Sequence, residues 1–271
     1  MDKGHRQEMI TGHLPHPANN YYFRIMKQML CRLGLIVLLL ATASTYSMAA
    51  GETGTVTIVV EPVFNGAPLQ LADQYYVNEH GDTLYIDLFR YYITNLRISQ
   101  GGNIVKDRNS HLVDAEYKES CCFKVSVPEG SYEYVEFTVG VDSVTNTNGA
   151  NGGDLDPVKG MYWAWNSGYI MAKMEGRSTV CKTRHHAFQL HIGGYMPPYN
   201  AARIVNIRLP KDAVVKKGTR TTIHIKADAA VWFKDKLDLG KTNEIMIPGK
   251  DACMIADKYA QMFSVTGVTN E

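Results

Sequence analysis

Apolar and polar residues alternate along several short segments between residues 55 and 227. The clearest segment is 132–141, in which Val135, Phe137, Val139 and Val141 share one face and more polar side chains occupy the other. A period of two predicts a strand that is buried on one side only. The same kind of pattern predicts five more strands, at residues 55–60, 91–98, 187–192, 203–209 and 221–227.

Residues typical of turns separate these segments, and no solenoid repeat is present. This spacing predicts an all-β fold, an antiparallel β-sandwich with Greek-key-like connections. The C-terminal region differs, because residues 251–263 carry Ile255, Tyr259 and Met262 at helical spacing after Pro248 and Gly249. We expect a short helix or loop there that packs on the sandwich.

One long polar stretch, residues 142–160, interrupts the pattern with four glycines, three asparagines and a proline. This composition argues against both helix and regular strand. Long loops in compact domains are often functional or disordered. The side chains of Asp142, Asn146, Asn148, Asp154 and Asp156 suggest a calcium site, but their spacing is not that of an EF-hand, and Asp and Asn favour turns for backbone reasons alone. We interpret them as turn residues.

The loop leads directly into the run 160–169, which holds two of the three tryptophans of the chain. If this run is a strand, Trp163 and Trp165 lie on one face, with Tyr162, Ala164 and Asn166 on the other. Such a concentration of aromatic area indicates packing, binding or reaction at this point. Simple core packing is the structural alternative.

The first 50 residues have the organisation of an export signal. An apolar run at 33–41 follows Lys27 and Arg32, and small residues at 47–50 form a cleavage site. The run is too short to span a bilayer, which takes about 20 residues. We therefore predict a signal peptide at 26–50, a translation start at Met26 with 1–25 as an upstream mis-annotated or disordered stretch, and one exported domain at 51–271, periplasmic or extracellular and without a transmembrane span.

Charge and motifs narrow the function. Residues 1–50 hold five of the 28 basic and two of the 27 acidic residues, so 23 and 25 remain and the predicted mature chain carries −2. The absence of a long basic patch argues against nucleic acid as a partner. The sequence contains no nucleophile elbow, zinc-protease, phosphate-loop or dinucleotide motif. We expect a protein that is not an enzyme.

Four cysteines remain after the predicted signal peptide. An even number in an exported protein predicts two disulfides, and a metal cluster would need closer spacing. A bond between the two adjacent cysteines would strain the peptide unit, so each is expected to pair with a distant one. The candidates are Cys121, Cys122, Cys181 and Cys253.

Several motifs together resemble the MbnP-like family of exported, copper-associated bacterial proteins. They are Asn-Leu-Arg at 95–97, Gly-Val-Asp at 140–142, Asp-Leu-Asp-Pro at 154–157, Gly-Met-Tyr-Trp-Ala-Trp-Asn-Ser-Gly-Tyr at 160–169, Lys-Met-Glu-Gly at 173–176 and His-Ile-Gly-Gly at 191–194. The resemblance covers roughly residues 54–265.

The resemblance implies unusual chemistry. In relatives, a tryptophan is oxidised to kynurenine, and its new aryl amine binds copper beside histidines; a dihaem peroxidase-like partner is associated with the oxidation. An indole nitrogen can only donate, whereas the opened ring exposes a lone pair, and imidazole suits copper. Carried onto this chain, the modified residue is Trp163 or Trp165, and His191 matches the downstream histidine.

This chain departs from the family pattern, because no histidine lies between His111 and His185. On a regular strand, His185 and His191 lie about 20 Å apart and cannot share an ion. His224 is the better candidate for a second ligand; His80 and His111 stay open. Met171 and Met174 fall on opposite faces of a strand and are expected in the core.

Two other functions compete with copper binding. In the first, Tyr162, Trp163, Trp165 and Tyr169 form an exposed platform for a carbohydrate or peptide. In the second, the domain is a structural accessory. A platform requires exposed, coplanar rings, and the structural alternative requires shielded rings without a ligand.

Overall fold

The computed structural model describes residues 24–30, 52–166, 168–235 and 237–271. The chain divides into two units, Met1–Ala50 and Gly51–Glu271. In the first, residues 24–30 are helical; the apolar run 33–41 of the predicted signal peptide lies outside the described residues. Among the described residues, none forms a helix long and apolar enough to cross a lipid bilayer.

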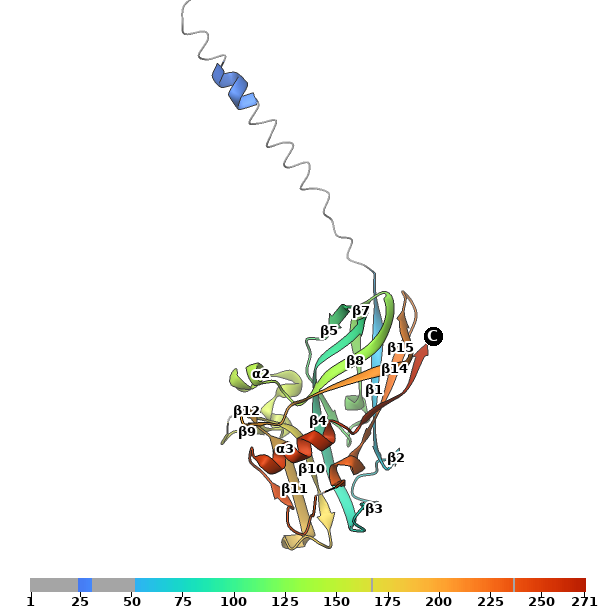
Figure 1. Cartoon of the computed structure of the whole chain (residues 1–271), viewed down its shortest axis with the longest axis vertical. Coiled ribbons are helices and arrows are strands. Elements are labelled where there is room, and N and C mark those ends of the chain that lie inside the picture. Colours follow the sequence, from blue (N-terminus) through green and yellow to red (C-terminus); the bar gives the residue numbers. More distant parts are fainter. Residues whose placement is uncertain (1–23, 31–51, 167, 236) are drawn as a thin grey trace, which may run out of the picture. The chain divides into compact units, whose positions relative to one another are not determined.

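The second unit contains two packed sheets (Figure 1). In the smaller sheet, β1 (Thr53–Phe64) pairs in parallel with β15 (Thr221–Asp228), which pairs antiparallel with β17 (Phe263–Asn270). On its other side, β1 pairs antiparallel with β7 (Cys122–Pro128) and β2 (Ala67–Pro68). The sheet is therefore mixed, with one parallel pair that the predicted antiparallel pattern did not include.

The larger sheet has the order β14 (Arg203–Val215), β8 (Gly130–Val139), β4 (Thr83–Gln100), β10 (Gly168–Ser178), β11 (Ala187–Gly193) and β16 (Glu244–Ile245). The long strand β4 pairs with β10 through its first half and with β8 through its second half. Short strands complete the sheet and its surroundings: β3 (Tyr75–Val77), β5 (Asn103–Lys106) and β6 (His111–Asp114) pair with β4, β9 (Tyr162–Trp163) pairs with β10, and β12 (Tyr195–Met196) forms a hairpin with β13 (Tyr199–Asn200).

The core lies between the two sheets. Val56, Ile58 and Val60 of β1 are buried in alternation with more exposed neighbours, as a half-buried strand requires. Aromatic rings join the sheets: Phe263 of β17 lies 5.0 Å from Phe137 of β8, between ring centroids. The all-β sandwich is thus confirmed, and so are the six predicted strands.

The helix α3 (Lys250–Tyr259) confirms the element predicted near the C-terminus. The prediction that 142–160 contains no regular structure is wrong, because this stretch holds the short helix α2 (Ser143–Thr147) and the 3-10 turns η2 (Gly153–Leu155) and η3 (Pro157–Lys159). The Asp142 side chain caps α2 by accepting a hydrogen bond from the Thr145 N–H at 2.9 Å. This cap offsets the poor helix propensity of the segment.

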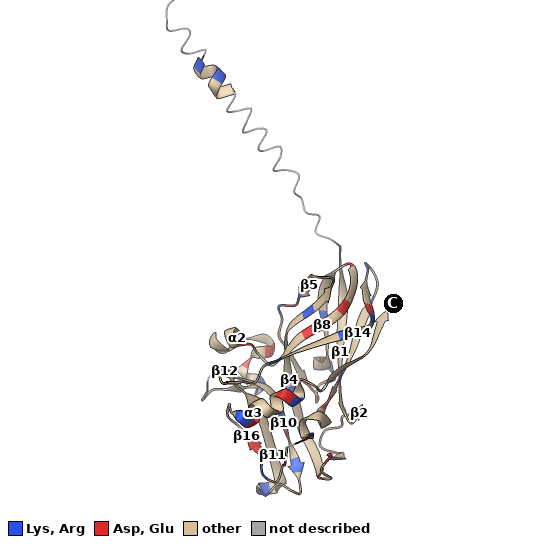
Figure 2. Cartoon of the chain, viewed as in Figure 1, with Lys and Arg blue, Asp and Glu red and all other residues tan. Residues whose placement is uncertain are grey.

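Charged residues of both signs are interspersed over the strands of this unit (Figure 2). This distribution agrees with the nearly balanced composition of the chain. Candidate chemistry must therefore be sought in local clusters rather than in one dominant field.

Candidate functional site

The 142–160 loop is fixed to the larger sheet by buried polar side chains. Asn146 donates to the Val141 carbonyl at 2.8 Å, and its side-chain oxygen accepts from the Tyr169 N–H at 2.8 Å. The Tyr169 hydroxyl donates to the Leu155 carbonyl at 3.0 Å. The Tyr92 hydroxyl donates to the Asp154 carbonyl at 3.2 Å, and burial raises the Tyr92 pKa. These bonds hold the loop in one position and so fix the segment that follows it.

The two tryptophans do not share a strand face as predicted. Strand β9 ends at Trp163, and a turn closed by the Asn166 N–H on the Trp163 carbonyl at 3.2 Å places Trp165 outside the strand. Trp163 is 5% exposed and Trp165 is 62% exposed. Their rings still touch, with centroids 5.4 Å apart and planes tilted by 37°.

The buried indole of Trp163 lies against Gly193 at the end of β11. A Cβ atom on Gly193 would come within 2.4 Å of the Trp163 ring, so only glycine allows this approach. The Trp163 Nε1 atom is buried and has no hydrogen-bond partner among the described residues. Such orphaned buried donors are rare and deserve a functional explanation.

His191 lies near the contact between Trp163 and Gly193. It lies two residues before Gly193, so the two positions share the face of β11 opposite to the buried Leu190 and Ile192. Its Nε2 atom is 2.7 Å from Glu175 Oε1, and Lys173 Nζ is 3.1 Å from the same oxygen. The hydrogen bond with His191 is the main cause that lowers the Glu175 pKa to about 2.

Strand register extends this cluster into a charged row. His191 is opposite Lys173, Lys173 is opposite Arg90, and Arg90 is opposite Asp114. Directly opposed side chains lie on the same face of a sheet. The row therefore runs across the outer face of the larger sheet from β11 to β6. Sequence reasoning missed it, although the alternation of Lys173 and Glu175 in an apolar strand was a usable signal.

The other candidate ligands lie elsewhere. His224 belongs to β15 of the smaller sheet, 3.4 Å from Glu61, and faces away from the buried Ile223 and Ile225. His224 and His191 therefore point outward from opposite sides of the sandwich, and the structure does not bring them together.

His80, His111 and His186 have partners of their own. His185 and His186 form a 3-10 turn before β11, and His186 contacts the Cys181 carbonyl at 2.9 Å. His111 pairs with Asp107 at 2.7 Å, and His80 lies 3.9 Å from Glu79. None of these rings contacts His191 among the residues that the structure describes.

The predicted disulfides are not confirmed, because Cys121, Cys122, Cys181 and Cys253 are all free. The thiols of Cys121, Cys181 and Cys253 each contact a different backbone carbonyl, of Asp114, Leu239 and Asn200 respectively. Cys122 is exposed at the start of β7. Burial raises the pKa of the Cys121 and Cys181 thiols, which disfavours the thiolate form that binds metals.

The side chains considered for soft-metal or calcium binding have structural roles. Met171 and Met174 are fully buried, as expected for core residues. Asp142 and Asp156 cap α2 and η3, which supports the interpretation as turn residues. No group of three or more His, Cys, Asp or Glu side chains within the described part of the chain is placed to hold a metal ion.

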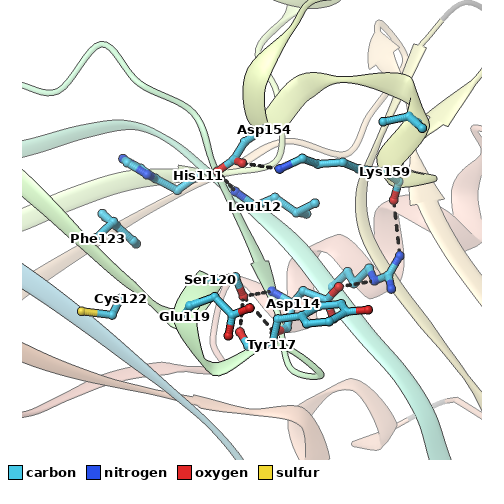
Figure 3. A pocket seen from close by; sticks show the side chains of 12 residues that line it. His111, Leu112, Asp114, Tyr117, Glu119, Ser120, Cys122, Phe123, Asp154 and Lys159 are labelled. Atoms are coloured by element: carbon cyan, nitrogen blue, oxygen red, sulfur yellow. Dashed lines mark hydrogen bonds and ion pairs between the residues drawn. The ribbon is translucent and has the colours of Figure 1, made fainter.

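A second feature, which the sequence did not indicate, is a cavity of about 560 Å³ beside β6 (Figure 3). Its walls come from β6, the 3-10 turn η1 (Lys118–Cys121) and the residues around η2 and η3. Arg90 and Asp114 of the charged row form part of its lining. The cavity therefore adjoins the same outer sheet face as His191, at the other end of the row.

Comparisons with known proteins agree with this architecture. The family model described as MbnP matches residues 53–254. Among solved structures, the chain is similar to MbnP from Methylosinus trichosporium, with a TM-score of 0.52 and 12% identity over 79% of this chain and 98% of that chain. At this identity the likeness shows the fold alone. The search of curated proteins returned no match.

Proposed function

Because the chain belongs to the MbnP family, we propose that it is an exported, non-catalytic protein that handles copper at the site formed by the 160–169 run and His191. Copper is the cargo in this proposal. The signal peptide proposed for residues 26–50 delivers the chain to the periplasm or the cell surface.

The position of Trp163 is the observation that carries the proposal. Its ring covers Gly193, next to His191 on the same face of β11, and it is 95% shielded from solvent. Its N–H group has no hydrogen-bond partner among the described residues. Opening the indole would therefore break no hydrogen bond between this atom and a described residue, and it would create a nitrogen lone pair in a shielded site.

The side chains near Gly193 can supply a small number of nitrogen ligands for copper. His191 offers an imidazole, which suits copper, and Glu175 holds its Nε2 atom at 2.7 Å. A carboxylate that fixes the ring in this way is a common support for a metal-binding histidine. Oxidised Trp163 would provide the second nitrogen. His224 is not part of this proposal, because it faces outward from the other sheet.

Trp165 gives the site its access to the surface. It is 62% exposed and in contact with the buried Trp163 ring. A large oxidising partner, which for this family we take to be a dihaem peroxidase-like protein, could approach Trp165 but not Trp163. We therefore propose Trp163 as the residue that is modified and Trp165 as the side chain that the partner contacts.

The alternative aromatic platform receives less support. Trp163 and Tyr169 are buried, and Tyr162 packs edge-on against Tyr169 with centroids 5.0 Å apart. Only Trp165 of the four rings is largely exposed. A single exposed ring does not make a stacking surface for an extended ligand.

The test is the copper content of the protein purified from its native host. We expect bound copper in the wild-type protein and its loss in His191→Gln, with His224→Gln as the matched control because His224 also pairs with a strand glutamate. Circular dichroism checks that each variant is folded. Copper at background level in the wild type, or equal loss in both variants, would contradict the proposal and favour a structural role.

A further inference from the structure

The cavity beside β6 has the size of a small-molecule site. Its volume of about 560 Å³ falls within the range of roughly 300–1,000 Å³ typical of ligand pockets. Figure 3 shows Asp154 and Lys159 on one side of it and Asp114 with Tyr117 on the other. The tryptophan site and its proposed copper chemistry use none of these four side chains.

The main charges in the cavity neutralise one another. Lys159 Nζ lies 2.6 Å from Asp154 Oδ1, and Arg90 Nε lies 2.7 Å from Asp114 Oδ2. A charged ligand would have to compete with these partners for the opposite charge. Glu119 has no ion-pair partner among the described residues. It is exposed at the rim of the cavity, where water screens its charge. The lining thus favours a neutral ligand.

The same ion pairs keep unused hydrogen-bonding capacity. Asp154 accepts from Lys159 and, through its other oxygen, from the Leu112 N–H at 3.0 Å, and each carboxylate oxygen has a further lone pair. Lys159 has three N–H donors and shows one side-chain partner, Asp154. Donors and acceptors therefore lie side by side. A hydroxyl group, which donates and accepts at once, matches such a surface better than a group that does only one.

The cavity also has an apolar side. Leu112 and Phe123 are buried in its wall, and His111 stacks on Phe123 with ring centroids 3.8 Å apart. At the rim, Tyr117 is 49% exposed and offers an aromatic face next to Asp114. A ring that carries hydroxyls on its edge and C–H groups on its faces complements both sides of the cavity.

We propose that this cavity binds a neutral polyhydroxylated ring, a mono- or disaccharide unit, with Tyr117 against the ring face and the Asp154–Lys159 pair on its hydroxyls. The site is separate from the platform considered for the 160–169 run, where the rings are mostly buried. It is also independent of the copper proposal, so either can fail without the other.

The test is isothermal titration calorimetry of the purified protein with glucose, galactose, mannose, N-acetylglucosamine, maltose and cellobiose. We expect saturable binding of at least one of them. Tyr117→Ala should weaken it about three- to tenfold, the effect of one lost aromatic contact. Asp154→Asn should weaken it about tenfold or more, because a charge-assisted acceptor is lost.

Tyr75→Ala is the matched control, because Tyr75 is 60% exposed on β3 and does not line the cavity. It should bind like the wild type. The Tyr117 variant removes only a rim side chain, so it keeps the test valid even if Asp154→Asn disturbs the loop. Glucosamine and glucuronate are titrated alongside as charged sugars. The proposal is overturned if no neutral sugar of the panel saturates the protein, if only these two charged sugars do, or if Tyr117→Ala binds as tightly as Tyr75→Ala.

Discussion

The two sheets of the sandwich each carry a histidine–glutamate pair on the outer face, and the pairs differ in what covers them. His191 and Glu175 are 2.7 Å apart, and the histidine side chain is 7% exposed. His224 and Glu61 are 3.4 Å apart, and that histidine is 33% exposed. Both pairs sit on strands with buried apolar residues on the opposite face. Beside the first pair, the Trp163 ring packs on Gly193, which shares the face of β11 that carries His191.

This comparison shows that two similar cross-strand pairs can differ in how far they are shielded from water. A cross-strand ion pair in water contributes little to stability, often below about 1 kcal/mol. The His191 side chain of the closer pair is shielded from water, so its hydrogen bond with Glu175 should contribute more. The contrast can be tested by removing the Trp163 ring, by adding a methyl group against that ring, and by neutralising each glutamate.

The largest effect on stability should come from removing the Trp163 ring. Trp163→Ala deletes a buried ring and should lower the free energy of unfolding by about 3–5 kcal/mol. Trp165→Ala, at an exposed position in the adjacent turn, should lower it by less than about 1 kcal/mol. Urea denaturation of both variants measures the difference. Equal losses would show that Trp163 does not pack as described.

A smaller effect on stability should follow from adding a methyl group against the Trp163 ring. Gly193→Ala places a methyl group within 2.4 Å of the Trp163 ring and should destabilise the fold by about 1–3 kcal/mol. Gly267→Ala is the control, since Gly267 lies opposite His224 and has no atom within 4 Å of its added Cβ among the described neighbours. It should change the free energy of unfolding by about 0.5 kcal/mol or less. A harmless Gly193→Ala would contradict the close contact.

Neutralising each glutamate should affect stability differently in the two pairs. Glu175→Gln weakens a shielded, charge-assisted bond and should lower the free energy of unfolding by about 1–2 kcal/mol. Glu61→Gln, in the open pair, should change it by about 0.5 kcal/mol or less. Thermal unfolding at neutral pH provides the measurement. A larger loss for Glu61→Gln would reverse the comparison.

The acid limb of the stability profile gives the finest test. In the folded chain, the His191 hydrogen bond lowers the Glu175 pKa from an ordinary 4.5 to about 2. Ionised Glu175 therefore stabilises the fold above pH 4.5, and this contribution is lost as the pH falls towards about 2. Denaturant titrations between these pH values should show a shallower decline for Glu175→Gln than for wild type. Parallel profiles would show that Glu175 is not held as the structure indicates.

Much of the fold could be predicted because strand periodicity is a local property. The segment 132–141 alternates clearly, and β8 covers 130–139. The parallel pairing of β1 with β15 could not be predicted, because it joins residues more than 160 positions apart and depends on the whole topology. The helix α2 was missed because one capping side chain, Asp142, outweighed the composition of its segment.

The site was predictable only in part. Trp163 and His191 were identified from the sequence, and the structure places both around Gly193. The shared face predicted for Trp163 and Trp165 was wrong because the chain turns at 164–166, where Asn166 and the following Ser-Gly were turn signals. Glu175, Arg90 and the cavity became visible only through cross-strand register, which sequence spacing within one strand does not contain.

The most direct measurement is tandem mass spectrometry of the 160–173 peptide from the protein purified from its native host. The account predicts that the mass change of tryptophan-to-kynurenine conversion maps to Trp163, with Trp165 unmodified. Two intact tryptophans in every molecule, or a change confined to the exposed Trp165, would contradict it.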